Sequence, residues 1–395
     1  MPSVDAAERN DHTRAQLLMG TDTRGVGDVE IVRLEARTVV VPLKRPTRIA
    51  RRELEERHYT VVRVSAADGP YGYGFCLSGA MASQVIRLGI APSVIGRSLY
   101  ATEGLWEEVY YDTILNGRRG AVLRALSAVD IAMWDLKGKL LGLPCAKLLG
   151  VFRPAVPAYA SGGYYYGGDP IREIKQEVSG WMEDGYKAIK IKVGGVPLEA
   201  DVARVAAARE VAGYDVELML DANNAWHDAA TAARAIKRFE EYSIAWVEEP
   251  LSPDDVRGHA ELRRRCTIPV ATGEIEATRW GFLHLMTSAA ADVLQPDATV
   301  VGGFTEWQRI AHTASSFGVP IAPHWFSDVH VHTVAAAPNG LWIEHFTDTS
   351  ILNVMELYEA SMVVKDGWAA VPSESGLGIN MDERAIDRYA IDAWQ

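Results

Sequence analysis

Short apolar runs alternate with longer amphipathic stretches along the second half of this chain. Each apolar run has about the length of one buried strand, and the stretches between the runs repeat apolar residues at helical spacing. This alternation predicts a recurring βα unit, the sequence pattern of a parallel barrel. Strands are expected at residues 155–161, 188–192, 216–220, 244–248, 269–272, 291–295, 319–323 and 341–344, and helices beginning near Pro170, Leu198, Asp228, Pro253, Ala277, Phe304 and Val329.

The first third of the chain has a different pattern. Apolar and polar residues alternate over residues 29–43, 59–66 and 71–76, which predicts a small antiparallel sheet. Residues 44–57 are polar and rich in arginine, and we expect a long functional loop there. Helical spacing then extends over residues 82–149, so a sheet followed by helices should precede the barrel.

These patterns divide the chain into four parts. We expect a loose polar tail at residues 1–27 and an α+β capping domain at residues 28–150. A (β/α)7β TIM-like barrel should occupy residues 151–348, and residues 349–395 should return to the capping domain. The fold class is therefore α/β.

A charged or polar residue stands at the end of most predicted barrel strands. Because barrel strands are parallel, their carboxyl ends meet at one mouth, and residues far apart in sequence become neighbours there. The pattern predicts a single active site at this mouth. The residues concerned are Lys192, Asp221, Glu248, Glu274, Asp297, His324 and Glu344.

Three of these residues are carboxylates on successive strands, namely Asp221, Glu248 and Glu274. Carboxylates gathered around one point raise one another's pKa unless a cation lies between them, and Mg²⁺ prefers carboxylate oxygens. The alternative is that each acid pairs with a nearby lysine or arginine. We expect one Mg²⁺ ion per active site.

Lys190 and Lys192 lie two residues apart on one strand, so both side chains point to the same face. Each ammonium group should lower the pKa of the other, which would leave one able to act as a base. Capping of a helix dipole or phosphate binding is the alternative. On other strands, Asp297 is placed to orient the His324 imidazole as an acid or base, and Glu344 to stabilise charge on a substrate oxygen. His330 and His332 fall in the following helix and are not expected to bind the metal.

Composition narrows the range of partners. The chain has 40 basic and 52 acidic residues and a net charge of −12, which disfavours nucleic acids and anionic membranes. Three widely spaced cysteines fit reduced thiols, and no apolar run reaches the length needed to span a membrane. We expect a cytoplasmic homo-oligomer that acts on a small carboxylate.

Several motifs together resemble the mandelate racemase group of the enolase superfamily. They are KIK, LDANNAW, VEEPL, ATGE, QPDATVVGG, APHW and WIEHF, preceded by RALSAVDIAMWDLKGKLLGLP. The resemblance implies that Asp221, Glu248 and Glu274 bind Mg²⁺, that Lys192 is a base beside Lys190, and that Asp297 and His324 form a second dyad. It gives Glu344 the electrophile role, places Asn223 near the metal, and leaves Glu249 as an outer-shell or surface residue.

Dehydration of a sugar acid, an aldonate or aldarate, to a 2-keto-3-deoxy acid is the first hypothesis. One of Lys192 and His324 would remove the α-proton, giving an enediolate, and the other would help expel the β-hydroxyl. Racemisation or epimerisation of a 2-hydroxy acid is the alternative, cycloisomerisation fits less well, and a non-catalytic barrel is remote. Candidate substrate contacts are Asn223, Lys190, Tyr164 and Trp325, with Arg48 and the nearby Arg45, Arg51 and Arg52 on the basic loop; the role of Glu276 stays open.

Overall fold

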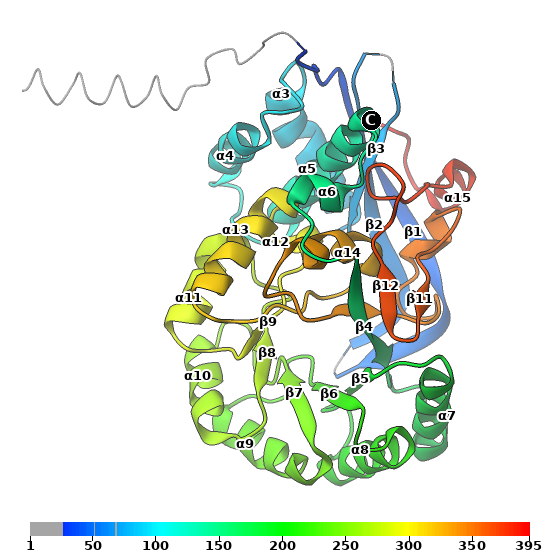
Figure 1. The fold of residues 1–395 in the computed structure, drawn as a ribbon, viewed down its shortest axis with the longest axis vertical. Helices are drawn as coiled ribbons and strands as arrows, with labels where there is room; N and C mark the ends of the chain where they lie inside the picture. The colour runs from blue at the N-terminus through cyan, green and yellow to red at the C-terminus, as the bar shows by residue number, and fades with distance from the viewer. Residues whose placement is uncertain (1–26, 51, 68) are drawn as a thin grey trace, which may run out of the picture.

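The computed structural model describes residues 27–50, 52–67 and 69–395, so residues 1–26 of the expected tail and Arg51 lie outside the described residues. The chain forms an N-terminal sheet-and-helix domain that sits against one end of a barrel (Figure 1). The predicted TIM-like barrel with an N-terminal α+β capping domain is confirmed.

The capping domain consists of an antiparallel sheet covered by helices. Helix α5 packs directly on strand β3, because a Cβ added at Gly72 or Gly74 would lie 2.2 or 2.0 Å from a backbone carbonyl of α5. Glycine at these positions therefore permits the close approach of helix and sheet. The strands, in the order β1-β2-β3, are β1 (Arg33–Ile49), β2 (Arg52–Ser65) and β3 (Gly72–Cys76). The helices are α2 (Ala80–Val85), η1 (Ile86–Ile90), α3 (Ala91–Val94), α4 (Thr102–Thr113), α5 (Ala121–Leu141) and α6 (Cys145–Leu149).

The expected basic loop at residues 44–57 is wrong. Strand β1 continues to Ile49 and β2 begins at Arg52, so most of this segment is a long hairpin with one register shift between Pro42 and Thr47. Alternation of basic and acidic residues places Arg48 opposite Glu53, and such opposite-charge pairs stabilise antiparallel strands. The tip of the hairpin reaches the barrel, where Arg48 forms an isolated bridge with Tyr165.

The barrel strands are parallel and follow one another in chain order. The expected strand at residues 319–323 is reduced to isolated bridges that link Ile321 to Leu294 and to Gly340. Pro320 and Pro323 flank Ile321 and have no backbone N–H to donate, which explains the shortened pairing. The last strand pairs with the first and closes the barrel. The strands are β4 (Ala155–Gly162), β5 (Ala188–Lys192), β6 (Glu217–Asp221), β7 (Ile244–Glu248), β8 (Val270–Thr272), β9 (Val293–Leu294) and β10 (Ile343–His345).

Helices surround these strands (Figure 1). Aspartate side chains cap four of them, since Asp169, Asp228, Asp255 and Asp297 each accept a backbone N–H of the first turn. The helix expected near Pro253 begins three residues later, after its Asp255 cap. The helices are α7 (Pro170–Glu183), α8 (Leu198–Ala212), α9 (Ala229–Lys237), η2 (Glu240–Tyr242), α10 (Val256–Arg265), α11 (Thr278–Thr287), α12 (Ala298–Val301), α13 (Gly303–Ser316) and α14 (Ser327–Ala336).

The C-terminal segment contacts both parts of the molecule. Strand β12 pairs antiparallel with β4 of the barrel, while Ala36 of β1 donates its N–H to the carbonyl of Gln395 at 2.9 Å. The segment contains η3 (Val354–Leu357), β11 (Val364–Lys365), β12 (Trp368–Ala370) and α15 (Glu383–Tyr389). Across the described part of the chain, no helix combines the length and the apolar character needed to cross a bilayer.

Candidate active site

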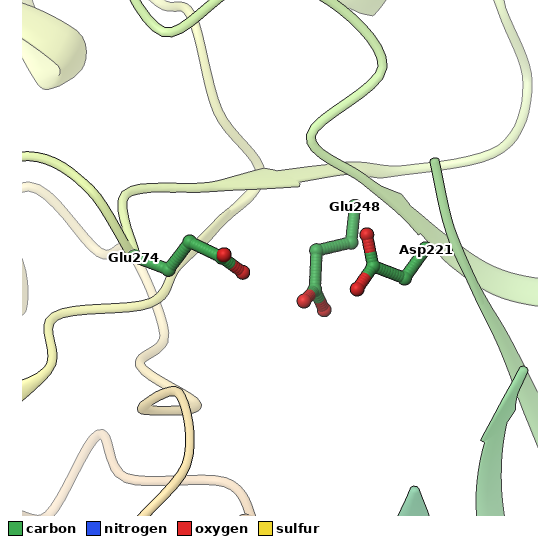
Figure 2. Close-up of side chains that lie close together, drawn as sticks. All are labelled: Asp221, Glu248 and Glu274. Carbon is green, nitrogen blue, oxygen red and sulfur yellow. The ribbon is translucent and has the colours of Figure 1, made fainter. Parts of the chain in front are cut away.

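Three carboxylates converge at the carboxyl ends of neighbouring strands. Asp221 and Glu248 are the last residues of β6 and β7, and Glu274 follows β8 by two residues. Figure 2 shows their side chains directed into one shared space, and one oxygen of each lies within 4.8 Å of the others. All three are buried, with 8% exposure at most. The barrel therefore gathers the three acids that the strand pattern predicts.

The electrostatics of this cluster fit a cation. Burial raises the pKa of Glu274 well above its usual range, and the nearby carboxylates of Glu249 and Asp221 raise it further. Its Oε2 is buried and has no hydrogen-bond partner among the described residues. Buried carboxylate oxygens without hydrogen-bond partners are suitable ligands for a hard divalent ion such as Mg²⁺. The residues present therefore fit the predicted metal.

The two lysines of β5 pair with carboxylates. Lys190 Nζ lies 2.6 Å from Glu248 Oε1 and 2.9 Å from Glu344 Oε1, while Lys192 Nζ contacts Asp221 Oδ2. Burial alone would lower the pKa of both lysines, but these carboxylates raise both pKa values above the usual range. Lys190 does lower the pKa of Lys192, as expected, but the facing acids outweigh this like-charge repulsion. The expectation that one lysine would have a lowered pKa is therefore wrong.

The predicted dyad is present on the other side of the cluster. His324 Nδ1 lies 3.0 Å from Asp297 Oδ2, and His324 Nε2 lies 3.6 Å from Glu274 Oε1. Burial pushes the pKa of Asp297 up, but the hydrogen bond with His324 holds it below its ordinary value. Thr299 donates both its N–H and its hydroxyl to Asp297 Oδ1, so the carboxylate has a fixed orientation. Asp297 can thus orient the imidazole.

Two residues outside the predicted site contact its acids: His330 lies near Asp297, and Gln295 bonds to Glu248. His330, on α14, lies 3.7 Å from Asp297 and accepts the N–H of Ala298 at 2.9 Å. Gln295 Nε2 donates to Glu248 Oε2 at 2.5 Å. His330 does not follow from strand-end spacing. Gln295 is the last residue of the strand predicted at residues 291–295, so its position at a strand end was a signal that could have found it. His332 contacts the backbone away from the dyad, donating to the Leu377 carbonyl and accepting the Ala146 N–H.

Glu344, on β10, lies beside Lys190, and its electrophile role stays a prediction. Its Oε2 accepts the N–H of Trp325 at 2.8 Å. Burial would raise the pKa of Glu344, but the Lys190 ammonium and other nearby cations lower it to about 2. Glu344 and Lys190 therefore form a buried ion pair beside the three carboxylates.

A cavity of about 460 Å³ lies at the barrel mouth. Lys190, an expected substrate contact, is not among its lining residues, nor are Asp221, Glu248 and Glu344. Lys192, Asp297 and His324 line the cavity, as do Asn223, Tyr164 and Trp325, in agreement with their expected positions. The Trp325 ring stacks on His324 with centroids 4.7 Å apart. Other lining residues include Ile49, Ala50, Arg57, Leu77, Arg124, Asn224, Glu249, Glu274, Ile275 and Phe326.

The structure places Arg48 at a smaller neighbouring cavity of about 140 Å³ instead. Arg48 has this position because it belongs to the hairpin tip, which pairs with Tyr165, another residue that lines the smaller cavity. The arginines that line the main cavity are Arg57 and Arg124. Arg57 is only 6% exposed, and its guanidinium lies 4.7 Å from the centre of the Trp325 ring.

Two further acids now have positions. Glu249 is 1% exposed and lines the main cavity, so it is not a surface residue. Glu276 is buried away from the metal cluster and lies 3.2 Å from Arg119 of the capping domain. Glu276 thus connects the barrel to the capping domain.

Two family models match most of this chain. The model described as "Mandelate racemase / muconate lactonizing enzyme, N-terminal domain" matches residues 31–150. The model described as "Enolase C-terminal domain-like" matches residues 173–385.

Proteins of known name are similar over nearly the same span. The chain is 34% identical over 336 residues to L-talarate/galactarate dehydratase of Salmonella typhimurium, covering 84% of this chain and 82% of the relative. It is 32% identical to D-galactarolactone cycloisomerase of Agrobacterium fabrum, covering 88% and 95%. The crystal structure of L-talarate dehydratase from Polaromonas sp. JS666, complexed with Mg and L-glucarate, superposes with a TM-score of 0.84 at 33% identity, covering 93% of this chain and 99% of that one.

Proposed function

Because the chain belongs to the mandelate racemase and muconate lactonizing enzyme family of the enolase superfamily, and is an enzyme of that superfamily, we propose that it is a Mg²⁺-dependent sugar-acid dehydratase. The substrate class is an aldonate or aldarate, and the product is a 2-keto-3-deoxy acid. Mg²⁺ is the cofactor, as in the similar L-talarate dehydratase solved with Mg.

One observation carries the proposal, namely the position of the two acid–base groups on either flank of the metal cluster. Lys192 contacts the β6 ligand Asp221, whereas His324 lies beside Glu274, which follows β8. Both line the same cavity, so a substrate held at the cluster would meet an amine on one side and an imidazole on the other. Dehydration needs a base for the α-proton and an acid for the leaving hydroxyl, which two such groups supply.

The chain's own residues account for the steps. One of Lys192 and His324 removes the proton next to the substrate carboxylate, and the other delivers a proton to the departing β-hydroxyl. Lys190 and Glu344 lie where they can stabilise the charge on the enediolate oxygens, and loss of one such group costs roughly 2.7–4 kcal/mol of transition-state stabilisation. When bound, Mg²⁺ supplies Lewis-acid stabilisation of the same negative charge.

Metal binding also explains how Lys192 can act as a base. The Asp221 carboxylate raises the pKa of Lys192. A cation bound by Asp221 would offset the negative charge of this carboxylate. The carboxylate would then stabilise the Lys192 ammonium less, so the pKa of Lys192 should fall towards its usual range.

The cavity lining fits a polyhydroxylated substrate. Asn223, Asn224 and Glu249 offer hydrogen-bonding groups, and Arg57 and Arg124 offer positive charge for a distal carboxylate. The similar dehydratase named for talarate and galactarate acts, by its name, on acids of this kind.

A substrate screen tests the proposal. Aldonates and aldarates are incubated with the enzyme and Mg²⁺, and 2-keto-3-deoxy acids are detected as they form. Lys192→Ala and His324→Asn should each abolish product, whereas Lys187→Ala, at an exposed lysine just before β5, should not. Failure of every acid sugar to give a keto acid would overturn the proposal. Deuterium uptake with loss of optical rotation would indicate a racemase instead, and lactone opening a cycloisomerase such as the named relative.

A further inference from the structure

A buried guanidinium lies behind the catalytic lysine on the side facing away from the metal cluster. Arg204, on α8, is 2% exposed. Its Nη1 donates to the backbone carbonyl of Lys192 at 2.7 Å, and its Nη2 donates to the carbonyl of Gly163. Arg204 therefore joins the ends of β5 and β4 through their backbones.

These two carbonyls lie just beyond the last strand pair. The ladder between β4 and β5 ends at Gly162 and Ile191, so Gly163 and Lys192 are the next residues on each strand. Two carbonyls cannot hydrogen-bond to each other, but the forked guanidinium donates to both. Arg204 thus extends the pairing by one step, at the residue whose side chain carries the amine.

A second layer holds Arg204 itself. Asp201, one helical turn earlier, lies 3.1 Å from Arg204 Nη1 and accepts the Gly194 N–H at 2.7 Å. The Tyr165 hydroxyl donates to Asp201 at 2.8 Å and accepts the Gly195 N–H at 3.0 Å. The loop that follows Lys192 is therefore fixed by the same network.

We propose that Arg204 is a positioning residue for Lys192, supported by Asp201 and Tyr165. On the β6 side, Lys192 is held by its strand pairing with Asp221 and by the N–H of Val193, which donates to the Asp221 carbonyl at 2.9 Å. The carbonyl of Lys192 is anchored by Arg204. Without Arg204 the lysine can tilt about the β6 anchor. The second dyad, which belongs to other strands, keeps its geometry. The assignment of Lys192 as a base on one face of the substrate rests on the proposed function.

The expected effect is confined to one face of the substrate. A displacement of about 1 Å in a reacting group can cost about 10²-fold in rate, and loss of a supporting partner about 10- to 100-fold. Arg204→Lys should therefore slow proton exchange by Lys192 about 10- to 100-fold, lowering kcat far more than it raises KM. Exchange by His324 should stay within about twofold of wild type.

Arg209 supplies the matched control. It lies on the same helix, is 3% exposed, and donates to the carbonyls of Gly213, Val216, Tyr242 and Ser243 near the amino ends of the strands. Arg209→Lys should lower the melting temperature about as much as Arg204→Lys, without a preference for one face.

The experiment measures α-proton exchange in D₂O by NMR for each acid sugar that gives a keto acid in the screen and for its C2 epimer. Lys192→Ala and His324→Asn first identify which epimer each group deprotonates. Selective loss of the Lys192-dependent exchange in Arg204→Lys, and not in Arg209→Lys, is the expected result. Equal slowing of both epimers, or the same slowing in Arg209→Lys, would overturn the proposal.

Two further measurements keep the outcome decisive. If Arg204→Lys does not fold, Tyr165→Phe removes only the hydroxyl between Asp201 and Gly195 and should slow the same exchange to a smaller extent. If no acid sugar gives a keto acid in the screen, the proposed function fails. Crystal structures of the two arginine variants then test the positioning role independently of activity. The contact between Lys192 and Asp221 should be lost in Arg204→Lys and kept in Arg209→Lys. A Lys192 that stays in place in that variant would contradict the role.

Discussion

Glu274 offers the sharpest test of the proposed metal cluster, because its proposed role in Mg²⁺ binding opposes its expected effect on the stability of the fold. It is buried near Asp221 and Glu248, and the neighbouring carboxylates and burial raise its pKa. Glu274→Gln removes one buried charge and one metal ligand while keeping nearly the same shape. We expect the metal-free variant to be at least as stable as wild type, and the variant to lose most of its response to Mg²⁺.

The size of that response follows from linkage. An ion that binds only the native state at 100 times its Kd stabilises the fold by about 2.7 kcal/mol. If loss of one of the three carboxylates raises Kd about 100-fold, the same Mg²⁺ concentration gives only about 0.4 kcal/mol. The difference of about 2 kcal/mol is well within the reach of urea unfolding.

The assay compares urea unfolding with and without Mg²⁺, together with calorimetric titration of the ion. Glu276→Gln is the control, since Glu276 is buried two residues away but pairs with Arg119 instead of facing the cluster. It should keep the full Mg²⁺-induced stabilisation. If Glu274→Gln responds to Mg²⁺ as wild type does, the three carboxylates do not form the metal site.

Other buried groups give predictions with known sign. Burial lowers the pKa of His332 from 6.5 to about 4, so the native state binds fewer protons than the unfolded chain. About 3 kcal/mol of stability should be lost as the pH falls from about 6.5 to 4, and urea unfolding should show no such loss in His332→Gln. Burial raises the pKa of Asp130 from 3.8 to about 6, so its effect is opposite: stability should fall by up to about 3 kcal/mol as the pH rises from about 4 to 6. Asp130→Asn should remove that slope in the same assay, and an unchanged slope would exclude Asp130 as its source. Asp297→Asn should lower kcat by about 10²- to 10⁴-fold in the keto-acid assay but leave the Mg²⁺-induced stabilisation intact; a lost metal response would place Asp297 at the metal.

The strand-end residues could be predicted because parallel strands leave little freedom. Once a βα repeat is recognised, Asp221 and Glu248 must end neighbouring strands and face one mouth. The same reasoning reached Glu274 and His324, which follow their strands by only a few residues. Position along a strand was sufficient, and no knowledge of side-chain contacts was needed.

Features that depend on competing contacts could not be predicted in this way. The pKa of Lys192 is set by the facing carboxylate, and sequence spacing gives no measure of that interaction against the neighbouring ammonium. The basic segment was predicted to be a loop because nearly all its residues are polar, so it has no alternation of apolar and polar positions. The pairing of Arg48 with Glu53 shows that it forms strands. The link from Arg204 to Lys192 and Gly163 gave no signal, since the groups that Arg204 contacts there are backbone carbonyls, and any residue has those.

Backbone strain gathers beside the functional residues of the barrel mouth. Asn223, Glu249 and Trp325 have φ values of 42°, 42° and 56°, and each lies within two residues of a proposed ligand or acid–base group. Such left-handed positions cost on the order of 1–3 kcal/mol each and persist only where the surrounding structure enforces them. Contacts at the opposite end of the strands can supply that enforcement, as the four carbonyls held by Arg209 illustrate. Left-handed backbone also occurs at the amino end of the strands, where Ser243 has a φ of 52° and its carbonyl accepts a hydrogen bond from Arg209. Arg204 is the corresponding anchor at the mouth, and because it holds the Lys192 carbonyl, it should act on catalysis as well as on folding.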